Sequence, residues 1–531
     1  MATLSNDAST TASALQPETA PELLRGEFKR NMGQISRHSL TFFGGTVFTM
    51  GVGYLVKIYV ARVLGAEMLG LYTLGMTLVS LTQLFGCLGL NGAAARYVAV
   101  YNATARYEDL RSFLTRSVAA VFFLNLGLSV GLLFCGGWVA RSLYHAPGLG
   151  QFIPLFAVLT VLGAVNVYYC QVLAGFKDIA KRTFITNFVG TSLVSALTVA
   201  LLARGTGMRG YLWAQVVNSV VVVALLFAVA WKLTPTAARF SWAPLSSFDP
   251  EIKAFAAASF GMSALDFLVS QADKVLLGLY LNPMLVGVYA VASTLLALLP
   301  LILQSVNQIF APVIADLHAR QGKDVLERLF QSLTKWVFGL TLPLAFVFIA
   351  FAPQLMRIFG PGFEKGWPVL VIGTVGQVVN CGVGSVGYLL LMSGNQKRLM
   401  RVQFVMVGVS LLMNISLIPV IGIVGAALAS ALVNVVGNVW NLTEVRKTLN
   451  IFPYNRGYLA LALPAALSAA SVVFLRFWSI SMSRPWLGIL AATVIAYFVF
   501  AGTALMVALD EDDRMIAISG WAQVRASLQG R

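Results

Sequence analysis

Charged residues are scarce in this chain. Only 11% of its 531 residues are Asp, Glu, Lys or Arg, whereas a typical soluble domain carries about 25%. Hydrophobic residues make up 58%, so a soluble fold would have too little polar surface to cover its exterior. This balance excludes the soluble classes and predicts a polytopic membrane protein.

Residues suited to metal or redox chemistry are equally few. The chain has four Cys and three His, no CxxC pair, and no His near any Cys. Each Cys lies in an apolar run, so we expect small core residues rather than a metal site. A phosphate-binding GxxxxGK[ST] motif is also absent, which argues against ATP as the driving force.

What the chain does contain is a series of long apolar runs separated by short basic loops. This pattern favours transmembrane helices over a β-barrel, whose strands are only about ten residues long. Fourteen runs approach the roughly 20 residues that a membrane-crossing helix needs. They lie at 40–62, 70–91, 116–137, 151–174, 183–203, 211–231, 253–280, 285–311, 334–352, 367–392, 402–420, 423–443, 457–477 and 486–508.

The distribution of basic residues tests this count. Most of the 37 Lys and Arg residues fall on one side if the N-terminus is cytoplasmic, as the positive-inside rule requires. Both termini are then cytoplasmic, and the charge of +16 reflects contact with membrane lipid rather than with nucleic acid. Loops on the outer side are short, which disfavours a membrane glycosyltransferase or ligase with an outward catalytic domain.

A weak internal repeat organises the apolar runs. When the chain is aligned with itself so that Lys57 meets Lys274, the turn Gly70-Leu71-Tyr72 meets Gly287-Val288-Tyr289. Six runs separate the copies, so both have the same orientation, as in parallel-repeat transporters. We predict an all-α protein with two six-helix lobes in parallel repeat plus two C-terminal helices. The expected divisions are a disordered and amphipathic tail at 1–38, lobes at 39–232 and 250–447, the last two helices at 457–509, and a cytoplasmic tail at 510–531.

Several short segments resemble the Wzx-type bacterial polysaccharide flippases, relatives of the MATE drug exporters and the lipid II flippase MurJ. They are Ala61-Arg62-Val63-Leu64-Gly65-Ala66-Glu67, Gly70-Leu71-Tyr72, Gly89-Leu90, Ala95-Arg96-Tyr97-Val98, Leu173-Ala174-Gly175 and Gly394-Asn395-Gln396-Lys397. The resemblance runs from about residue 37 to 450. It implies a protein of the bacterial inner membrane that moves an undecaprenyl-diphosphate-linked oligosaccharide from the cytoplasmic to the periplasmic leaflet. The glycan would serve O-antigen, capsule or exopolysaccharide synthesis, with the polymerase machinery as a candidate partner.

Ionisable residues inside the apolar runs are the first candidates for a site, because each costs roughly 2.5–3.5 kcal/mol to insert at the bilayer centre. Lys57 and Lys274 occupy equivalent places in the repeat. Two cations facing each other across a cavity would suit a diphosphate. The alternative for Lys57 is a stem that reaches the outer headgroups.

Two carboxylates lie in the same run as Lys274. Asp266 and Asp273 are spaced to lie near one helix face, about 10 Å apart along the axis. Asp266, the deepest acid in the apolar runs, is the first candidate for coupling to an H+ or Na+ gradient, because burial raises the pKa of a carboxylate, and Asp273 is the second. The alternative is a structural ion pair with a neighbouring helix.

Other polar residues are weaker candidates. Arg96 and Arg116 are candidate contacts for the diphosphate at a cytoplasmic gate, or ordinary positive-inside anchors. Gln304 and Asn307 form a polar band suited to sugar hydroxyls. Arg62 and Glu67 bracket an outer turn, either as a gate or lobe-to-lobe salt bridge or simply as residues of the turn. Tyr72, Tyr280 and Tyr289 are further candidates for sugar contact.

The function that this pattern favours is therefore transport rather than enzymatic catalysis. A flippase working by alternating access is the leading hypothesis, without a cofactor other than a coupling H+ or Na+. The alternatives are a MATE-type drug or cation antiporter and a flippase for another lipid-linked precursor. An antiporter of cations predicts an acid-dominated cavity, whereas here the membrane cations match the acids in number.

Overall fold

The computed structural model describes residues 20–239, 248–479 and 485–508. Within these residues every regular element is helical. Eleven helices are long and apolar enough to cross a membrane, and a twelfth is added if the bent pair Pro283–Leu296 and Leu301–Gln308 counts as one. The chain is therefore a multi-pass, all-helical membrane protein.

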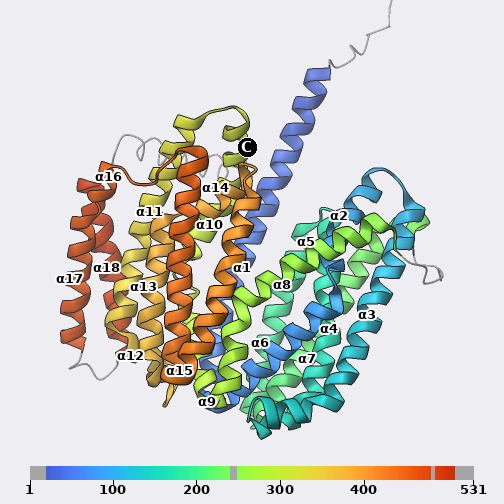
Figure 1. The fold of residues 1–531 in the computed structure, drawn as a ribbon, viewed down its shortest axis with the longest axis horizontal. Coiled ribbons are helices and arrows are strands. Elements are labelled where there is room, and N and C mark those ends of the chain that lie inside the picture. Colours follow the sequence, from blue (N-terminus) through green and yellow to red (C-terminus); the bar gives the residue numbers. More distant parts are fainter. Residues whose placement is uncertain (1–19, 240–247, 480–484, 509–531) are drawn as a thin grey trace, which may run out of the picture.

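The helices before residue 240, here called the N-half, gather on one side of the molecule (Figure 1). They are α1 (Ala20–Cys87), α2 (Leu90–Ala103), α3 (Tyr107–Trp138), α4 (Ile153–Gly175), α5 (Ile179–Thr183), η3 (Phe184–Gly190), α6 (Thr191–Ala203) and α7 (Gly207–Leu233), with short turns η1 (Val139–Leu143), η2 (Pro147–Phe152) and η4 (Thr236–Ala238).

The helices after residue 247, here called the C-half, and the last two helices lie mostly on the other side (Figure 1). They are α8 (Pro250–Tyr280), α9 (Pro283–Leu296), α10 (Leu301–Ala319), α11 (Lys323–Ala350), α12 (Ala352–Arg357), η5 (Phe363–Gly366), α13 (Trp367–Val383), α14 (Val386–Met392), α15 (Gln396–Leu449), α16 (Arg456–Leu459), α17 (Ala462–Ser479) and α18 (Pro485–Val507). Helices α1 and α9 pack together between the two sides, and α8 contacts both α15 and the N-half helices α1 and α2.

Two of the long helices contain a sharp kink where the sequence predicts a boundary between two spans. In α1 the backbone is non-helical at Gly65, with φ 77°. In α15 it is non-helical at Ile421 and Gly422, with φ 60° at the glycine. A positive φ is a conformation that glycine adopts without steric cost. The count of eleven above treats α1 and α15 as one membrane-spanning helix each. The fourteen separate crossings expected from the sequence therefore remain a prediction.

Two predicted spans are wrong as single helices. The run 285–311 is divided into α9 and α10, which meet at an angle of 50°. Pro300 is the N-cap residue of α10. Proline has no backbone N–H, so it cannot donate the hydrogen bond that a continuous helix would need at this position. The run 367–392 is divided into α13 and α14 at Gly384, where φ is 76°.

The part of the expected 1–38 tail that the structure describes, residues 20–38, is instead the beginning of α1 and is continuous with the first span (Figure 1). The expected terminal tails before residue 20 and after residue 508 lie outside the described residues. Three of the four cysteines, Cys87, Cys170 and Cys381, are buried as predicted, whereas Cys135 is exposed on α3.

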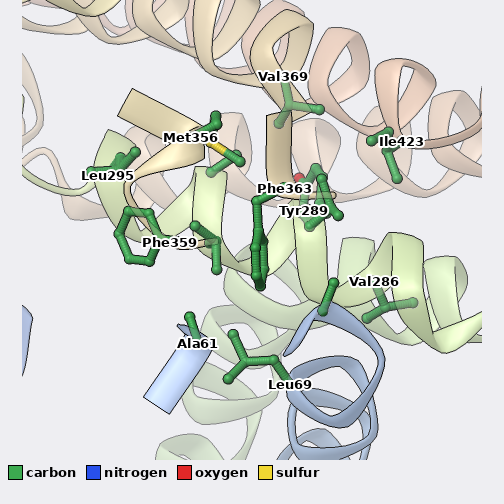
Figure 2. Packing of buried hydrophobic residues seen from close by; sticks show 14 of the residues in the cluster. Ala61, Leu69, Val286, Tyr289, Leu295, Met356, Phe359, Phe363, Val369 and Ile423 are labelled. Atoms are coloured by element: carbon green, nitrogen blue, oxygen red, sulfur yellow. The ribbon is translucent and has the colours of Figure 1, made fainter. Parts of the chain in front are cut away.

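At one end of the molecule the two halves share one apolar core. Figure 2 shows Ala61 and Leu69 of α1 beside Val286 of α9 and beside Phe359 and Phe363 of the α12–η5 segment. We call this the joined end. It contains the kink of α1, the α8–α9 turn and the loop that follows α12.

At the opposite end, here called the divided end, the helices of the two halves diverge (Figure 1), and each half has an apolar core of its own. The N-half cluster includes Tyr97 and Phe113, and also Ile252 at the start of α8. The C-half cluster includes Phe310 and Phe330. The halves are thus held together by apolar packing at the joined end, while at the divided end α8 is the element that crosses to the N-half.

Candidate functional site

The two membrane lysines come from different halves and lie near each other. Lys57 on α1 and Lys274 on α8 are close enough for their charges to repel. The Lys57 ammonium donates a hydrogen bond to the Thr294 hydroxyl on α9. The Lys274 ammonium stays with its own helix, donating to Oε1 of Gln271 at 2.9 Å and to the carbonyl of Ser270 at 3.2 Å.

Neither ammonium has a carboxylate partner in the described part of the chain. All of their acceptors are neutral oxygens. An ammonium in a low-dielectric setting is stabilised far better by an anion than by a hydroxyl. Within the described residues, Lys57 and Lys274 thus have no directly bonded anion, and two such ammonium groups suit an anionic ligand.

Lys57 is held by a small network that sequence reasoning missed. The Tyr54 hydroxyl donates to the backbone carbonyl of Thr294 at 2.6 Å. The Thr294 hydroxyl donates to the carbonyl of Ala290 at 2.8 Å, so it accepts the bond from Lys57. A signal was present, because Tyr54 lies one helical turn before Lys57, and Thr294 occupies the place of Thr77 in the repeat.

Asp273 lies beside the lysines but is not their ion-pair partner. Its Oδ2 accepts a hydrogen bond from the Tyr289 hydroxyl of α9 at 2.7 Å, and its Oδ1 accepts from the backbone N–H of Lys274 at 2.8 Å. Tyr289 is 3% exposed. A carboxylate of α8 is thereby connected to a buried side chain of α9.

Asp266 has a different environment. It lies two turns earlier on α8 and is exposed. Among the described residues the structure gives its side chain no hydrogen-bond partner. Asp266 and Asp273 thus differ in what they contact, and only Asp273 is held by a neighbouring helix.

Arg96 is one of a group of α2 side chains that contact the start of α8 at the divided end. Its guanidinium lies 3.7 Å from the Glu251 carboxylate and 4.6 Å from the centre of the Phe255 ring. The Tyr97 hydroxyl donates to the same carboxylate at 3.2 Å. Burial raises the pKa of Tyr97, and the charge of Glu251 adds to this rise. Arg96 therefore secures the start of α8 against the N-half, with half of its side chain still exposed.

The remaining predicted contacts are scattered. Arg116 lies on α3, and its Nε is buried without a hydrogen-bond partner in the described residues. On α10, Gln304 is exposed while Asn307 is only 7% exposed, so the two do not share one accessible face. Tyr72 packs on Tyr211 with ring centres 4.8 Å apart, and Tyr280 is exposed at the end of α8.

A small polar pocket lies between the end of α1 and helices α2, α4 and α8. The polar groups that line it include Gln83, Asn91 and Ser263. Oδ1 of Asn91 is buried and has no hydrogen-bond partner within the described residues. Such an acceptor suits a hydroxyl or amide donor from a bound molecule.

Neither Arg62 nor Glu67 forms a salt bridge to the other half within the described residues. Arg62 instead donates from Nε to the carbonyl of Ile358 at 2.7 Å. This bond joins α1 to the segment after α12, across the joined end. Glu67 is exposed beyond the kink of α1.

The joined end also contains a close backbone contact between the two copies of the turn motif. A β-carbon at Gly70 would overlap the carbonyl oxygen of Pro283, and one at Gly287 would overlap the carbonyl oxygen of Ala66. Pro283 and Ala66 are themselves equivalent when Lys57 is aligned with Lys274. The contact is thus reciprocal, as expected around a two-fold axis, and it requires glycine at both positions.

Comparison with known proteins extends this description. Residues 59–362 match the family model described as "Polysaccharide biosynthesis protein". A curated relative, the "Probable flippase AglR" of Haloferax volcanii, is 23% identical over 438 residues, covering 80% of this chain and 86% of the relative.

Solved structures share the fold. A structure of the lipid II flippase MurJ in an inward closed conformation has a TM-score of 0.71 at 14% identity, covering 88% of this chain and 98% of that one. An inward-facing MATE family multidrug transporter of the MOP superfamily has a TM-score of 0.60 at 15% identity, covering 78% and 98%. At such identities the likeness establishes the fold alone.

Proposed function

The chain belongs to the polysaccharide biosynthesis protein family, and from this premise we propose that it is a flippase for a lipid-linked glycan. Its substrate is an undecaprenyl-diphosphate-linked oligosaccharide, which it moves from the cytoplasmic to the periplasmic leaflet for O-antigen or exopolysaccharide synthesis. The name of its relative AglR, a probable flippase, supports this assignment.

The observation that carries the proposal is the pair of Lys57 and Lys274. Their ammonium groups come from different halves, repel each other and have only neutral acceptors. A diphosphate between them would replace repulsion with two charge-assisted contacts. A membrane transporter would keep two such cations together at this cost because its substrate is an anion.

The arrangement of the two ends supports alternating access. We assign the joined end to the periplasmic side and the divided end, with both termini, to the cytoplasm of a bacterial inner membrane. Counting α1 and α15 as two crossings each, and the bent pair of α9 and α10 as one, then gives fourteen. The polar head enters between the halves at the divided end while the polyprenyl chain stays in lipid, and the joined end opens to release the head.

The sugar and the gate have candidate contacts of their own. The exposed Gln304 and the pocket around Asn91 offer neutral hydrogen-bonding groups to hydroxyl-rich sugars, whereas Asn307 is buried. Arg96 and Arg116 meet the incoming diphosphate at the divided end, where Arg96 is still half exposed.

We assign coupling to an H+ or Na+ gradient to Asp273 before Asp266. When a coupling carboxylate binds or releases its ion, the change must affect the position of other helices. Asp273 has such a connection, because it accepts a hydrogen bond from the Tyr289 hydroxyl of α9. Asp266 makes no such contact in the described structure. Asp266 is the second candidate for this role.

An exporter of cationic drugs fits this site less well. A cation placed beside Lys57 and Lys274 would be repelled by both, whereas the fold that this chain shares with MATE transporters is compatible with many substrates.

The test is translocation in proteoliposomes. Purified protein is reconstituted with a polyprenyl-diphosphate disaccharide that carries a fluorophore on its sugar, and a membrane-impermeant reductant quenches the outer-leaflet label. We expect the protected fraction to fall with protein present and to stay constant in protein-free vesicles. A cationic dye transported instead of the glycan lipid would overturn the assignment.

A further inference from the structure

Lys57 of the N-half forms a side-chain hydrogen bond with the C-half, which suggests a second role for this residue. Its partner Thr294 lies on α9, and Tyr54 of α1 bonds to the same residue. Thr294 is seven residues inward of Gly287, which is about 10 Å along the helix axis. The network therefore lies at the inner edge of the packing that closes the joined end.

The equivalent position in the other half is not used in this way. Thr77 corresponds to Thr294, and its hydroxyl likewise donates to the carbonyl four residues earlier, that of Thr73, at 2.8 Å. Lys274 does not reach Thr77, however, and bonds to Gln271 instead. The two lysines thus differ: Lys57 bridges the halves, while Lys274 remains on its own helix.

We propose that Thr294, with Tyr54, positions Lys57 as a lock on the joined end that the substrate's diphosphate releases. The inference rests on the proposed function for its ligand, but not for the lock itself. When the site is empty, separating Lys57 from Thr294 leaves the ammonium without a hydrogen-bond acceptor in a low-dielectric setting. The free-energy cost of that state keeps the bond in place. With a diphosphate bound, phosphate oxygens keep the ammonium solvated when it leaves.

This difference links binding to movement. A ligand shifts a conformational equilibrium by its differential interaction with the two states. Here the anion lowers the cost of parting α1 from α9, so the joined end opens when the site is loaded and stays closed when it is empty. Thr294 does this without touching the substrate, as a positioning residue.

The experiment measures opening of the joined end directly. Spin labels are placed at Arg204→Cys in the N-half and Lys365→Cys in the C-half, both exposed at the joined end, in a background with Cys135→Ser. Distances are measured in nanodiscs by pulsed electron resonance. The ligand-free variants compared are Thr294→Val, which keeps the shape but removes the acceptor, Thr294→Ser, which keeps the acceptor, and Thr77→Val as the matched control.

We expect Thr294→Val to raise the ratio of long to short distances roughly tenfold without ligand, the factor for losing one hydrogen bond to a charged group. Tyr54→Phe should raise it less, while Thr294→Ser and Thr77→Val should resemble the parent. A Thr294→Val distribution identical to the parent, or an equal shift in Thr77→Val, would overturn the lock.

A second arm adds geranylgeranyl diphosphate, with geranylgeraniol as the control that lacks phosphate. The parent should open with the diphosphate alone, and Thr294→Val should respond less because it is already open. If the diphosphate neither binds nor opens the parent while Thr294→Val opens without ligand, the lock stands and the proposed substrate class fails. If the diphosphate binds but Thr294→Val is unchanged, the substrate stands and the lock fails.

Discussion

A lysine in a membrane helix must be solvated by something, and the identity of that partner decides what the residue does. Lys57 has a threonine hydroxyl and Lys274 a glutamine side chain, although carboxylates such as Asp273 lie on the same helices. Asp273 accepts a hydrogen bond from Tyr289 and forms no ion pair with either lysine in the described structure. This arrangement supports the anion-binding role that we propose for Lys57 and Lys274.

Replacing either lysine should therefore abolish function without loss of the protein. For Lys57→Ala and Lys274→Ala we expect transport to fall at least roughly 30-fold, since removing one partner of a buried charge contact costs about 2 kcal/mol or more. Surface polysaccharide in a complemented deletion strain and translocation in proteoliposomes measure this, with membrane protein amount checked by immunoblot.

The matched control is Lys397→Ala, which removes an exposed lysine at the divided end. This variant should transport normally. Normal polymer in both Lys57→Ala and Lys274→Ala cells would exclude the pair as the diphosphate site.

The two carboxylates of α8 should differ in the same assay. Asp273→Asn loses a charge that is bonded to another helix, so we expect it to lose the response to an imposed pH or sodium gradient. Asp266→Asn, exposed and without a partner in the described structure, should keep most of it. The rate of translocation is compared with and without each gradient, and the reverse order of effects would move the coupling role to Asp266.

At the scale of the elements, the contact of Gly70 with Gly287 determines whether the joined end can close. Gly70→Ala and Gly287→Ala each place a methyl group against a carbonyl oxygen of the other half. Such overpacking costs about 1–3 kcal/mol, so we expect both variants to favour an open joined end. Labelling of Arg204→Cys and Lys365→Cys with spin probes would reveal longer distances, together with slower transport.

The control lies on the same helix as Gly70. A β-carbon at Gly51 would meet no atom within 4 Å, so Gly51→Ala should leave the distances unchanged. If Gly70→Ala behaved like Gly51→Ala, the close approach would not be a requirement of the closed state.

The sequence predicted the elements better than their joints. Apolar length is a local property, so the spans around Lys57 and Lys274 were found from composition. The kink at Gly65 coincides with a predicted boundary because a turn is also specified by a few residues that are adjacent in the sequence. The break before Pro300 was missed because a proline inside an apolar run is compatible with either a kink or a full break, and only packing against neighbouring helices decides between them.

The same limit applies to the site. The repeat pointed to Lys57 and Lys274 as equivalents, but symmetry in sequence does not specify asymmetric contacts. Thr294 was overlooked because a threonine in a membrane helix usually bonds to its own backbone, which it also does here. Its bond to Lys57 depends on how α1 and α9 meet, which no local pattern encodes.

At the scale of the whole molecule, the distribution of positive charge agrees with the two ends seen in the fold. The joined end contains few basic residues, among them Arg62, Arg204 and Lys365. The divided end contains many, including those that flank the α2–α3 and α10–α11 turns. Because basic loops are retained in the cytoplasm, this distribution supports the orientation that we propose, with the divided end in the cytoplasm.

This orientation is testable residue by residue. Single cysteines at Arg204 and Lys365 should react with a membrane-impermeant maleimide in intact cells whose outer membrane has been made permeable, because they lie at the joined end, which we assign to the periplasm. A cysteine at Lys397, at the divided end, should react only after the inner membrane is opened. All three side chains are exposed. A difference in their labelling would therefore report the side of the membrane on which each lies, not a difference in burial. Labelling of Lys397→Cys in intact cells, with protection of the other two, would invert the molecule and with it the direction of transport proposed here.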